Sequence, residues 1–140
     1  MEWHFKTFVL STERKESSAV ETHALLQTTY WGHARPIDVV EKMLHSSLCF
    51  FLRSGEQQIG FARVITDGVT TSWLADVVLS EQFQNDGLGS WMMECVMAHP
   101  DIAETQFALQ TGSAHAFYKR LGFAQNEALM STAVDYLKAD

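Results

Sequence analysis

The chain of 140 residues has few cysteines, few prolines and no long apolar run, and each shortage excludes a class of protein. Its two cysteines, Cys49 and Cys95, lie in separate apolar stretches, so we expect buried free thiols rather than a disulfide framework. No apolar run approaches the roughly 20 residues that cross a bilayer. With no Pro-, Gly- or Ser-rich linker and no secretory leader in the sequence, we expect a single domain over residues 1–140, cytoplasmic and without a membrane partner.

Basic residues are also scarce, with 10 Lys and Arg against 17 Asp and Glu, for a net charge of −7. This balance argues against nucleic acid as a partner, because binding it relies on neutralising phosphates. It weakly favours cationic small molecules. The six histidines and two cysteines show no zinc-ligand spacing, so we expect no metal.

What the chain does contain is a change of hydrophobic period that predicts an α+β fold. Helical spacing predicts helices over 17–31, 36–47, 88–98 and 113–121, with Pro36 opening the second and Ser113 capping the fourth. Apolar and β-branched runs predict strands. These strands are expected at Trp3–Leu10, 47–53, 57–66, 71–79 and 106–111, with closing strands at 123–127 and 128–134.

Short turn signals, Ser-Gly-Glu at 54–56 and Asp-Gly at 67–68, separate three of these strands and predict an antiparallel meander. The expected architecture is a mixed, mostly antiparallel sheet of six to seven strands flanked by about four helices. Gly122 suits the left-handed position after the last helix.

The stretch QNDGLGS, residues 84–90, places Gly87 and Gly89 where a strand gives way to a helix. A helix N-terminus has unpaired N–H groups and a partial positive charge, and so binds anions readily. Glycine lets an anion approach the backbone closely. A tight loop without any ligand is the plain alternative at this point.

Two motifs in this strand order resemble those of the GNAT superfamily of N-acetyltransferases, and the stretches TTYWGHARP, IGFARVITD and LADVVL resemble a subgroup of its small bacterial members. The first is Gln84-x-x-Gly87-x-Gly89 after the strand at 71–79. The second is the stretch TGSAHAFYKRLGF, from Thr111 to Phe123, with its alanine, tyrosine and final Gly-Phe. The resemblance spans residues 3 to about 134 and implies the GNAT fold, in which the fourth expected strand splays from the fifth.

The resemblance implies acetyl-CoA as acetyl donor. The pantetheine arm would pair with the edge of the fourth strand, and the pyrophosphate would lie on the amides of the glycine loop. The cofactor-binding residues so implied are Val77, Val78, Leu79, Gln84, Asn85, Asp86, Gly87, Leu88, Gly89, Ser90, Thr111, Ala114 and Phe117.

One residue departs from the family pattern, because Asp86 stands where many members carry a basic side chain. A carboxylate beside a phosphate costs on the order of 1 kcal/mol near a surface. We therefore predict weaker CoA binding than is usual in the family, unless Asp86 faces solvent.

For catalysis, Tyr118 aligns with the tyrosine that acts as general acid in many GNAT enzymes. Asp76 interrupts the apolar strand WLADVVL, where an unpaired carboxylate is costly. It is our candidate base; the alternatives are an anchor for the substrate ammonium group and an ion-pair partner of Arg63.

On the acceptor side, the family places the substrate near the first two helices and the loop between them. We expect Tyr30, Trp31, Arg35 and His115 to contact it, with His33 nearby and His115 three residues before Tyr118. Adjacent aromatic rings can hold an amine by cation–π contact.

The predicted function is transfer of acetyl from acetyl-CoA to the primary amine of a small molecule or peptide by direct attack, in a chain that can pair into a homodimer. The rival interpretation is a non-catalytic acyl-CoA-binding sensor or regulatory module with the same fold, and Asp86 is the residue that most favours it. A nucleotide-phosphate binder is excluded, since the chain has no Walker-type lysine or parallel βαβ unit.

Overall fold

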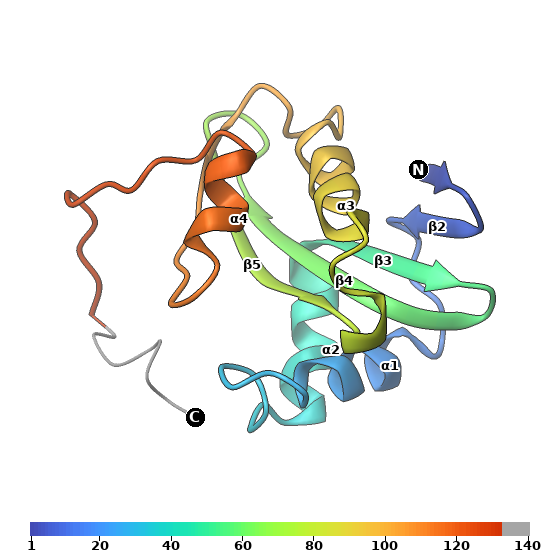
Figure 1. The fold of residues 1–140 in the computed structure, drawn as a ribbon. Coiled ribbons are helices and arrows are strands. Elements are labelled where there is room, and N and C mark those ends of the chain that lie inside the picture. Colours follow the sequence, from blue (N-terminus) through green and yellow to red (C-terminus); the bar gives the residue numbers. More distant parts are fainter. Residues whose placement is uncertain (133–140) are drawn as a thin grey trace.

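The computed structural model describes residues 1–132, which form a curled sheet with helices on both faces (Figure 1). The strands are β1 (Glu2–Phe5), β2 (Phe8–Ser11), β3 (Leu48–Ser54), β4 (Gln57–Thr66), β5 (Thr71–Leu79) and β6 (Gln106–Ala108). The helices are α1 (Ser18–Leu26), α2 (Ile37–Ser46), α3 (Leu88–Met97) and α4 (His115–Arg120), with a 3₁₀ turn at Glu81–Phe83.

The strands follow one another across the sheet in chain order, β1 to β6. Neighbours from β1 to β5 are antiparallel, and only β6 runs parallel to its neighbour β5. The meander predicted from the two turn signals is therefore confirmed as β3, β4 and β5, as is the mixed six-stranded sheet with four helices in the described residues.

Alternation along the strands builds two cores, one on each face of the sheet. Phe50 and Phe51 are adjacent on β3 and both fully buried, yet they belong to different cores. Phe50 packs in the core beneath α3, and Phe51 packs in the core beneath α1 and α2. The sheet is thus a shared middle layer, which fixes α3 on the opposite side from the first two helices (Figure 1).

The first predicted strand, Trp3–Leu10, is wrong as a single element. The chain instead forms a hairpin, β1 and β2, which turns at Lys6 with φ of 54°. Turn prediction depends on glycine, asparagine, aspartate or proline, and this turn uses none of them.

The helix predicted over 17–31 ends early, at Leu26. The hydroxyls of Thr28 and Thr29 donate to the carbonyls of Leu25 and Leu26 at 2.6 and 2.7 Å, which satisfies the last helical acceptors. Residues 27–34 therefore form turns rather than a fourth helical turn, and they carry Tyr30 and Trp31.

Three other local predictions are corrected. Ser113 does not cap α4: the N-cap residue is Ala114, no side chain caps the helix, and Thr111 Oγ1 accepts from the Ala114 N–H at 3.0 Å just before it. Pro36 lies just before α2, in extended backbone, rather than in its first turn. No strand forms over 123–127 or 128–132, so the closing strands are wrong there, and the last two residues of the second lie outside the described part.

The expectation of two buried free thiols is confirmed, because Cys49 and Cys95 are both buried and unpaired. Burial raises the pKa of the Cys49 thiol to about 12, so it stays protonated and unreactive at neutral pH. Gly122 also adopts the expected left-handed conformation after α4, with φ of 100°.

Candidate active site

The separation of β5 from β6 opens the sheet in the middle. The two strands pair at only three positions, from Thr71 with Gln106 to Trp73 with Ala108. Beyond Trp73, β5 continues to Leu79 without a strand on this side in the described chain. The expected splay is therefore present, and it leaves the backbone edge of residues 74–79 open to an extended ligand.

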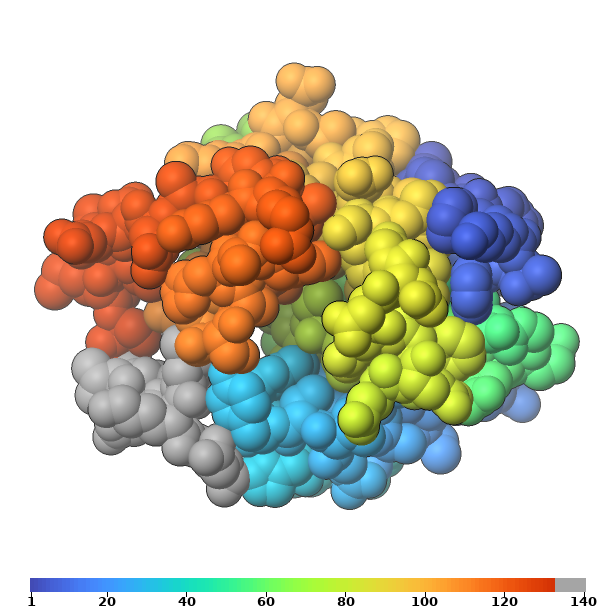
Figure 2. All heavy atoms as spheres, in the orientation of Figure 1, coloured from blue at the N-terminus to red at the C-terminus, as the bar shows by residue number. Residues whose placement is uncertain are grey.

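A cavity of about 400 Å³ lies in this splay, between β5 and the segment that follows β6. Leu74, Ala75 and Val77 line it from β5, and Leu109 and Gln110 line it from the other side. Figure 2 shows the surface hollowed between the segment around 110–120 (orange) and the loop before α3 (yellow-green).

The bottom of the cavity is shaped by a bulge in β5 at Asp76. Phe61 pairs with Val78 and Arg63 with Ala75, so Ala62 on β4 faces both Asp76 and Val77. Asp76 adopts a left-handed φ of 55°, which is rare for a residue other than glycine. A bulge leaves its extra residue outside the ladder of hydrogen bonds, and here it does so at the edge of the cleft.

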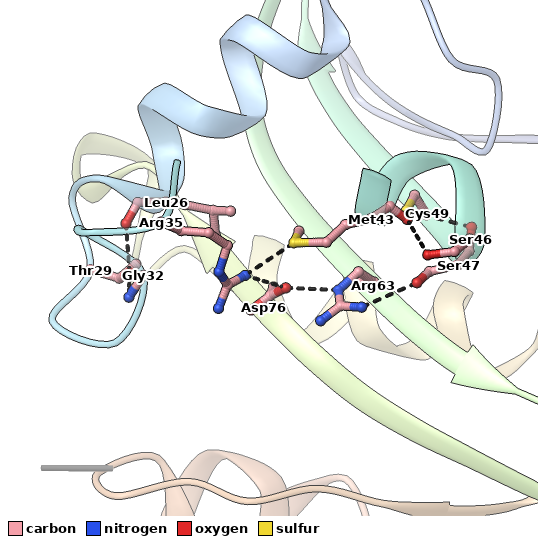
Figure 3. A network of polar contacts seen from close by, with 10 residues as sticks. All are labelled: Leu26, Thr29, Gly32, Arg35, Met43, Ser46, Ser47, Cys49, Arg63 and Asp76. Atoms are coloured by element: carbon pink, nitrogen blue, oxygen red, sulfur yellow. Dashed lines mark hydrogen bonds and ion pairs between the residues drawn. The ribbon is translucent and has the colours of Figure 1, made fainter. Parts of the chain in front are cut away.

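The Asp76 carboxylate is held by two arginines that come from different parts of the chain (Figure 3). Its Oδ2 accepts from Arg63 Nε at 2.8 Å and forms an ion pair with Arg35 Nη1 at 2.7 Å. The Asp76 side chain is 1% exposed, whereas each arginine side chain is 16% exposed. Two positive charges thus flank one buried negative charge, and the arginine side chains are more exposed than the carboxylate between them.

Both arginines are fixed by further contacts. Arg63 Nη1 donates to the Ser47 hydroxyl at 3.1 Å, and Arg35 Nη1 lies 3.4 Å from the Met43 sulfur. These contacts connect the start of β3 and helix α2 to the sheet bulge (Figure 3). The cluster therefore holds the loop before α2 against the strands that carry the cleft.

Tyr118, from α4, lines the cavity opposite the bulge and is 9% exposed. Its ring makes edge contacts with Phe117 and Phe123, at 5.0 and 5.6 Å between centroids. Burial raises the pKa of the Tyr118 phenol to about 12. The phenol therefore keeps its proton at neutral pH and is available as a donor.

The glycine loop ends close to this cleft, at the N-terminus of α3. Gly87 occupies the N-cap position with φ of 77°, and no side chain caps the helix. The backbone N–H groups of residues 85–90 have no hydrogen bond recorded within the described chain. The loop therefore presents a run of unpaired donors at the positive end of a helix dipole, as the sequence predicted.

Two side chains of this loop adopt defined positions. Gln84 Nε2 donates to the Leu79 carbonyl at 2.8 Å, which ties the loop to the end of β5. Asp86 is exposed. Weaker CoA binding is predicted only if Asp86 does not face solvent, so for this exposed side chain the loss of affinity is not expected.

The structure brings seven of the sequence-predicted site residues to one cavity. Those lining the cleft are Tyr30, Trp31, Asp76, Val77, Thr111, Ala114 and Tyr118. Arg35 does not line the cleft itself but forms an ion pair with Asp76, which does. Val78 lies instead in the core beneath α1 and α2, and Phe117 packs 3.6 Å from the position that a Cβ on Gly89 would take.

Both histidines lie outside this cavity. His115 lines an adjoining cavity of about 900 Å³ between β6, α4 and the segment after Gly122, which Tyr118 lines as well. His33 is exposed, and its Nδ1 lies 3.0 Å from the carbonyl of Tyr30 in the α1–α2 loop. The structure therefore places His115 beside Tyr118 but brings neither histidine to Asp76 in the cleft.

Sequence reasoning missed Arg63 as a site residue, although it named Arg63 as a possible partner of Asp76. Arg63 lines the cavity, and its charge is only partly balanced there. The sequence feature that could have identified it is a basic residue inside the apolar stretch IGFARVI of β4. Such a residue is as unusual as the Asp76 carboxylate on the neighbouring strand.

Within residues 1–132 no group of three or more His, Cys, Asp or Glu side chains is placed to hold a metal ion. In the same part of the chain no helix is both long and apolar enough to cross a membrane.

We predict that replacing Asp76 with Asn lowers the free energy of unfolding by about 3–5 kcal/mol, because two partly buried guanidinium groups lose their counter-ion. Urea unfolding measures the change. Glu41→Gln is the matched control, since it breaks the exposed pair between Glu41 and Arg14 and is expected to cost only about 0–1 kcal/mol. Equal effects of the two substitutions would contradict a structural role for the buried cluster.

Comparison with known proteins identifies the family. Residues 45–125, more than half of the chain, match the model of the acetyltransferase (GNAT) domain. A Gibberella zeae protein named "Putative acetyltransferase FG08082" is 30% identical over 144 aligned residues, which cover 86% of this chain and 81% of the relative.

Solved structures agree with this match. A protein of Xanthomonas campestris pv. campestris, described as "a putative acetyltransferase belonging to the gnat family", has a TM-score of 0.80 at 32% identity, over 95% of this chain and 97% of the other. A GNAT family acetyltransferase from Elizabethkingia anophelis with acetyl-CoA bound has a TM-score of 0.71 at 15% identity, over 94% and 85% of the two chains. The chain belongs to the GNAT family of acetyltransferases, whose members use acetyl-CoA.

Proposed function

We propose that this protein transfers the acetyl group of acetyl-CoA to a primary amine by direct attack of the amine nitrogen on the thioester carbonyl. The observation that carries the proposal is the convergence of three features on one cleft. They are the open edge of β5, the unpaired amides before α3, and the buried phenol of Tyr118.

The residues present fit acetyl-CoA. An ideal Cβ on Gly87 would meet no atom within 4 Å, so the space beside the left-handed backbone is open to an anion. The amides of residues 85–90 would hold the pyrophosphate, and the free edge of Val77 to Leu79 would pair with the pantetheine arm. When bound, acetyl-CoA supplies the thioester that the amine attacks. Gln84 would act by fixing the loop against β5 rather than by touching phosphate, since its amide already donates to the Leu79 carbonyl.

Tyr118 would act as the general acid. Transfer breaks the carbon–sulfur bond, and the departing thiolate needs a proton. The buried phenol is protonated at neutral pH, with its pKa raised to about 12 by burial. Phe117 and Phe123 hold the ring in place, so that the hydroxyl is presented to the cleft in one orientation.

The bulge at Asp76 would polarise the thioester carbonyl. Its extra residue leaves backbone groups outside the ladder at the cleft edge, where fixed N–H donors stabilise a developing oxyanion. The two arginines that hold the Asp76 side chain also keep this part of the backbone, and its N–H donors, rigid.

Asp76 is better placed to position the arginines than to act as the base. Its Oδ2 already accepts from two donors, and its Oδ1 is buried with no partner in the described chain. A side chain that is 1% exposed does not reach an amine in the cavity. The amine would then enter as its free base or lose its proton to water, and the rate of acetyl transfer would rise with the fraction of amine that is deprotonated.

The rival function, a non-catalytic acyl-CoA sensor, shares the glycine loop but requires no proton donor. Measuring thiol release decides between them: turnover with an amine supports the enzyme, and tight binding of acetyl-CoA without turnover of any amine supports the sensor. A cytoplasmic location and a homodimer remain proposals from the sequence, and the cleft as described depends on neither.

We predict that Tyr118→Phe lowers kcat by about 10²- to 10⁴-fold, because the phenyl ring keeps the packing but removes the acidic proton. Thiol release with a saturating amine measures kcat, and calorimetry with acetyl-CoA is expected to give an unchanged Kd. A variant with wild-type kcat would overturn the acid role. Loss of acetyl-CoA affinity would show instead that Tyr118 shapes the cofactor site.

The pH dependence offers a separate prediction. Because the pKa of Tyr118 is raised to about 12, its acid form persists when an ordinary tyrosine, with a pKa near 10, is half ionised. We expect kcat/KM to rise with pH as the amine deprotonates and to show no descending limb below pH 10. A descending limb with an apparent pKa of 10 or lower, in protein that circular dichroism shows to be folded, would contradict this assignment.

A further inference from the structure

We propose that the acceptor is a small amine that also carries a carboxylate, and that Arg63, reinforced by Arg35, binds this carboxylate. The inference rests on the proposed function and names the class of substrate for the same cleft. It runs against the net charge of −7, which on its own favours a cationic ligand.

The local charge of the cleft is the first argument. Among the described residues that line the cavity, Arg63 and Asp76 are the charged ones, and Arg35 joins them through its ion pair with Asp76. Two guanidinium groups against one carboxylate leave one positive charge uncompensated. Because that charge lies in a recess rather than on open surface, solvent screens it less than it screens an exposed arginine.

The unused donors are the second argument. Arg63 donates hydrogen bonds from Nε to Asp76 and from Nη1 to Ser47, and its Nη2 has no hydrogen-bond partner within residues 1–132. Arg35 uses Nη1 alone, for Asp76 and for the Met43 sulfur. A guanidinium group carries five N–H donors in a planar fork, which matches a carboxylate. The remaining N–H groups of these two arginines are held in place by Asp76, have no acceptor within residues 1–132, and can therefore bind an anion.

The arrangement of exposure is the third argument. The neutralising carboxylate side chain is 1% exposed, whereas the two arginine side chains that flank it are each 16% exposed (Figure 3). An incoming molecule therefore meets more arginine surface than carboxylate surface. A site built to hold an ammonium group would present the carboxylate first.

The size of the cavity and its single net charge limit the ligand further. A volume of about 400 Å³ admits a molecule of amino-acid size beside the end of the acetyl donor. One net positive charge balances one carboxylate but not a doubly charged phosphate. Tyr30 and Trp31 line the same cavity and offer an aromatic wall for the rest of the molecule.

The test compares amino acids with their amides, which differ only in the carboxylate. The common amino acids and the corresponding amino-acid amides are assayed by thiol release with saturating acetyl-CoA. We expect at least one free amino acid to exceed its amide in kcat/KM by about 10- to 100-fold, the value of a charge-assisted hydrogen bond in a recess. The amide has the more easily deprotonated amine, so the chemistry alone would favour it.

Variants connect the preference to the arginine. Arg63→Gln is expected to reduce the preference to below about threefold while leaving the Kd for acetyl-CoA unchanged, and Arg63→Lys to retain part of it because the charge remains. Arg14→Gln is the matched control, since Arg14 pairs with Glu41 away from the cleft. It is expected to keep the full preference.

The outcomes separate the two proposals. Turnover of amides equal to or greater than that of the free acids would overturn the carboxylate assignment and leave the acetyltransferase in place. Preference for an aminoalkyl phosphate of similar size would overturn it too. A preference that survives Arg63→Gln would overturn the role of Arg63. Binding of acetyl-CoA with no turnover of any amine would overturn the enzyme and this inference with it.

Discussion

The separation of β5 from β6 is the constraint on which the rest of the site depends. Three paired positions hold the two strands together, and after Trp73 they part. A fully paired sheet would have used the edge of β5 for hydrogen bonds within the fold and left no space for a ligand. Because the strands part here, the bulge at Asp76, the phenol of Tyr118 and the α1–α2 loop all border one recess.

The buried cluster of Asp76, Arg35 and Arg63 gives this opening a fixed shape. A splayed sheet loses ladder hydrogen bonds, and the cluster supplies other links across the same region, from the α1–α2 loop through β5 to β4 and Ser47 (Figure 3). The cluster therefore serves both folding stability and ligand binding, because the same three side chains hold the cleft in shape and set its charge. The glycine loop adds the third component, a helix N-terminus with free donors, tied to β5 by Gln84.

The sequence predicted the parts of the fold that depend on local pattern. The meander followed from two short turns, and the left-handed position of Gly122 from glycine itself. It failed at the hairpin around Lys6, where the left-handed residue is of no type that favours such a turn, and at the closing strands, where apolar alternation alone does not create a partner. The pairing of Arg35 with Asp76 was also missed. It joins a loop to a distant strand, and no local spacing reports such a contact.

The central claim is that the glycine loop before α3 is the acetyl-CoA site, and calorimetric titration of acetyl-CoA into Gly87→Trp and Gly55→Trp tests it most directly. Both glycines have positive φ, 77° and 62°, and no atom within 4 Å of an added Cβ, so the backbone penalty is matched. We expect Gly87→Trp to lower the affinity for acetyl-CoA by at least about tenfold, or roughly 1.4 kcal/mol, and Gly55→Trp to bind like wild type. Wild-type affinity in Gly87→Trp would contradict the claim.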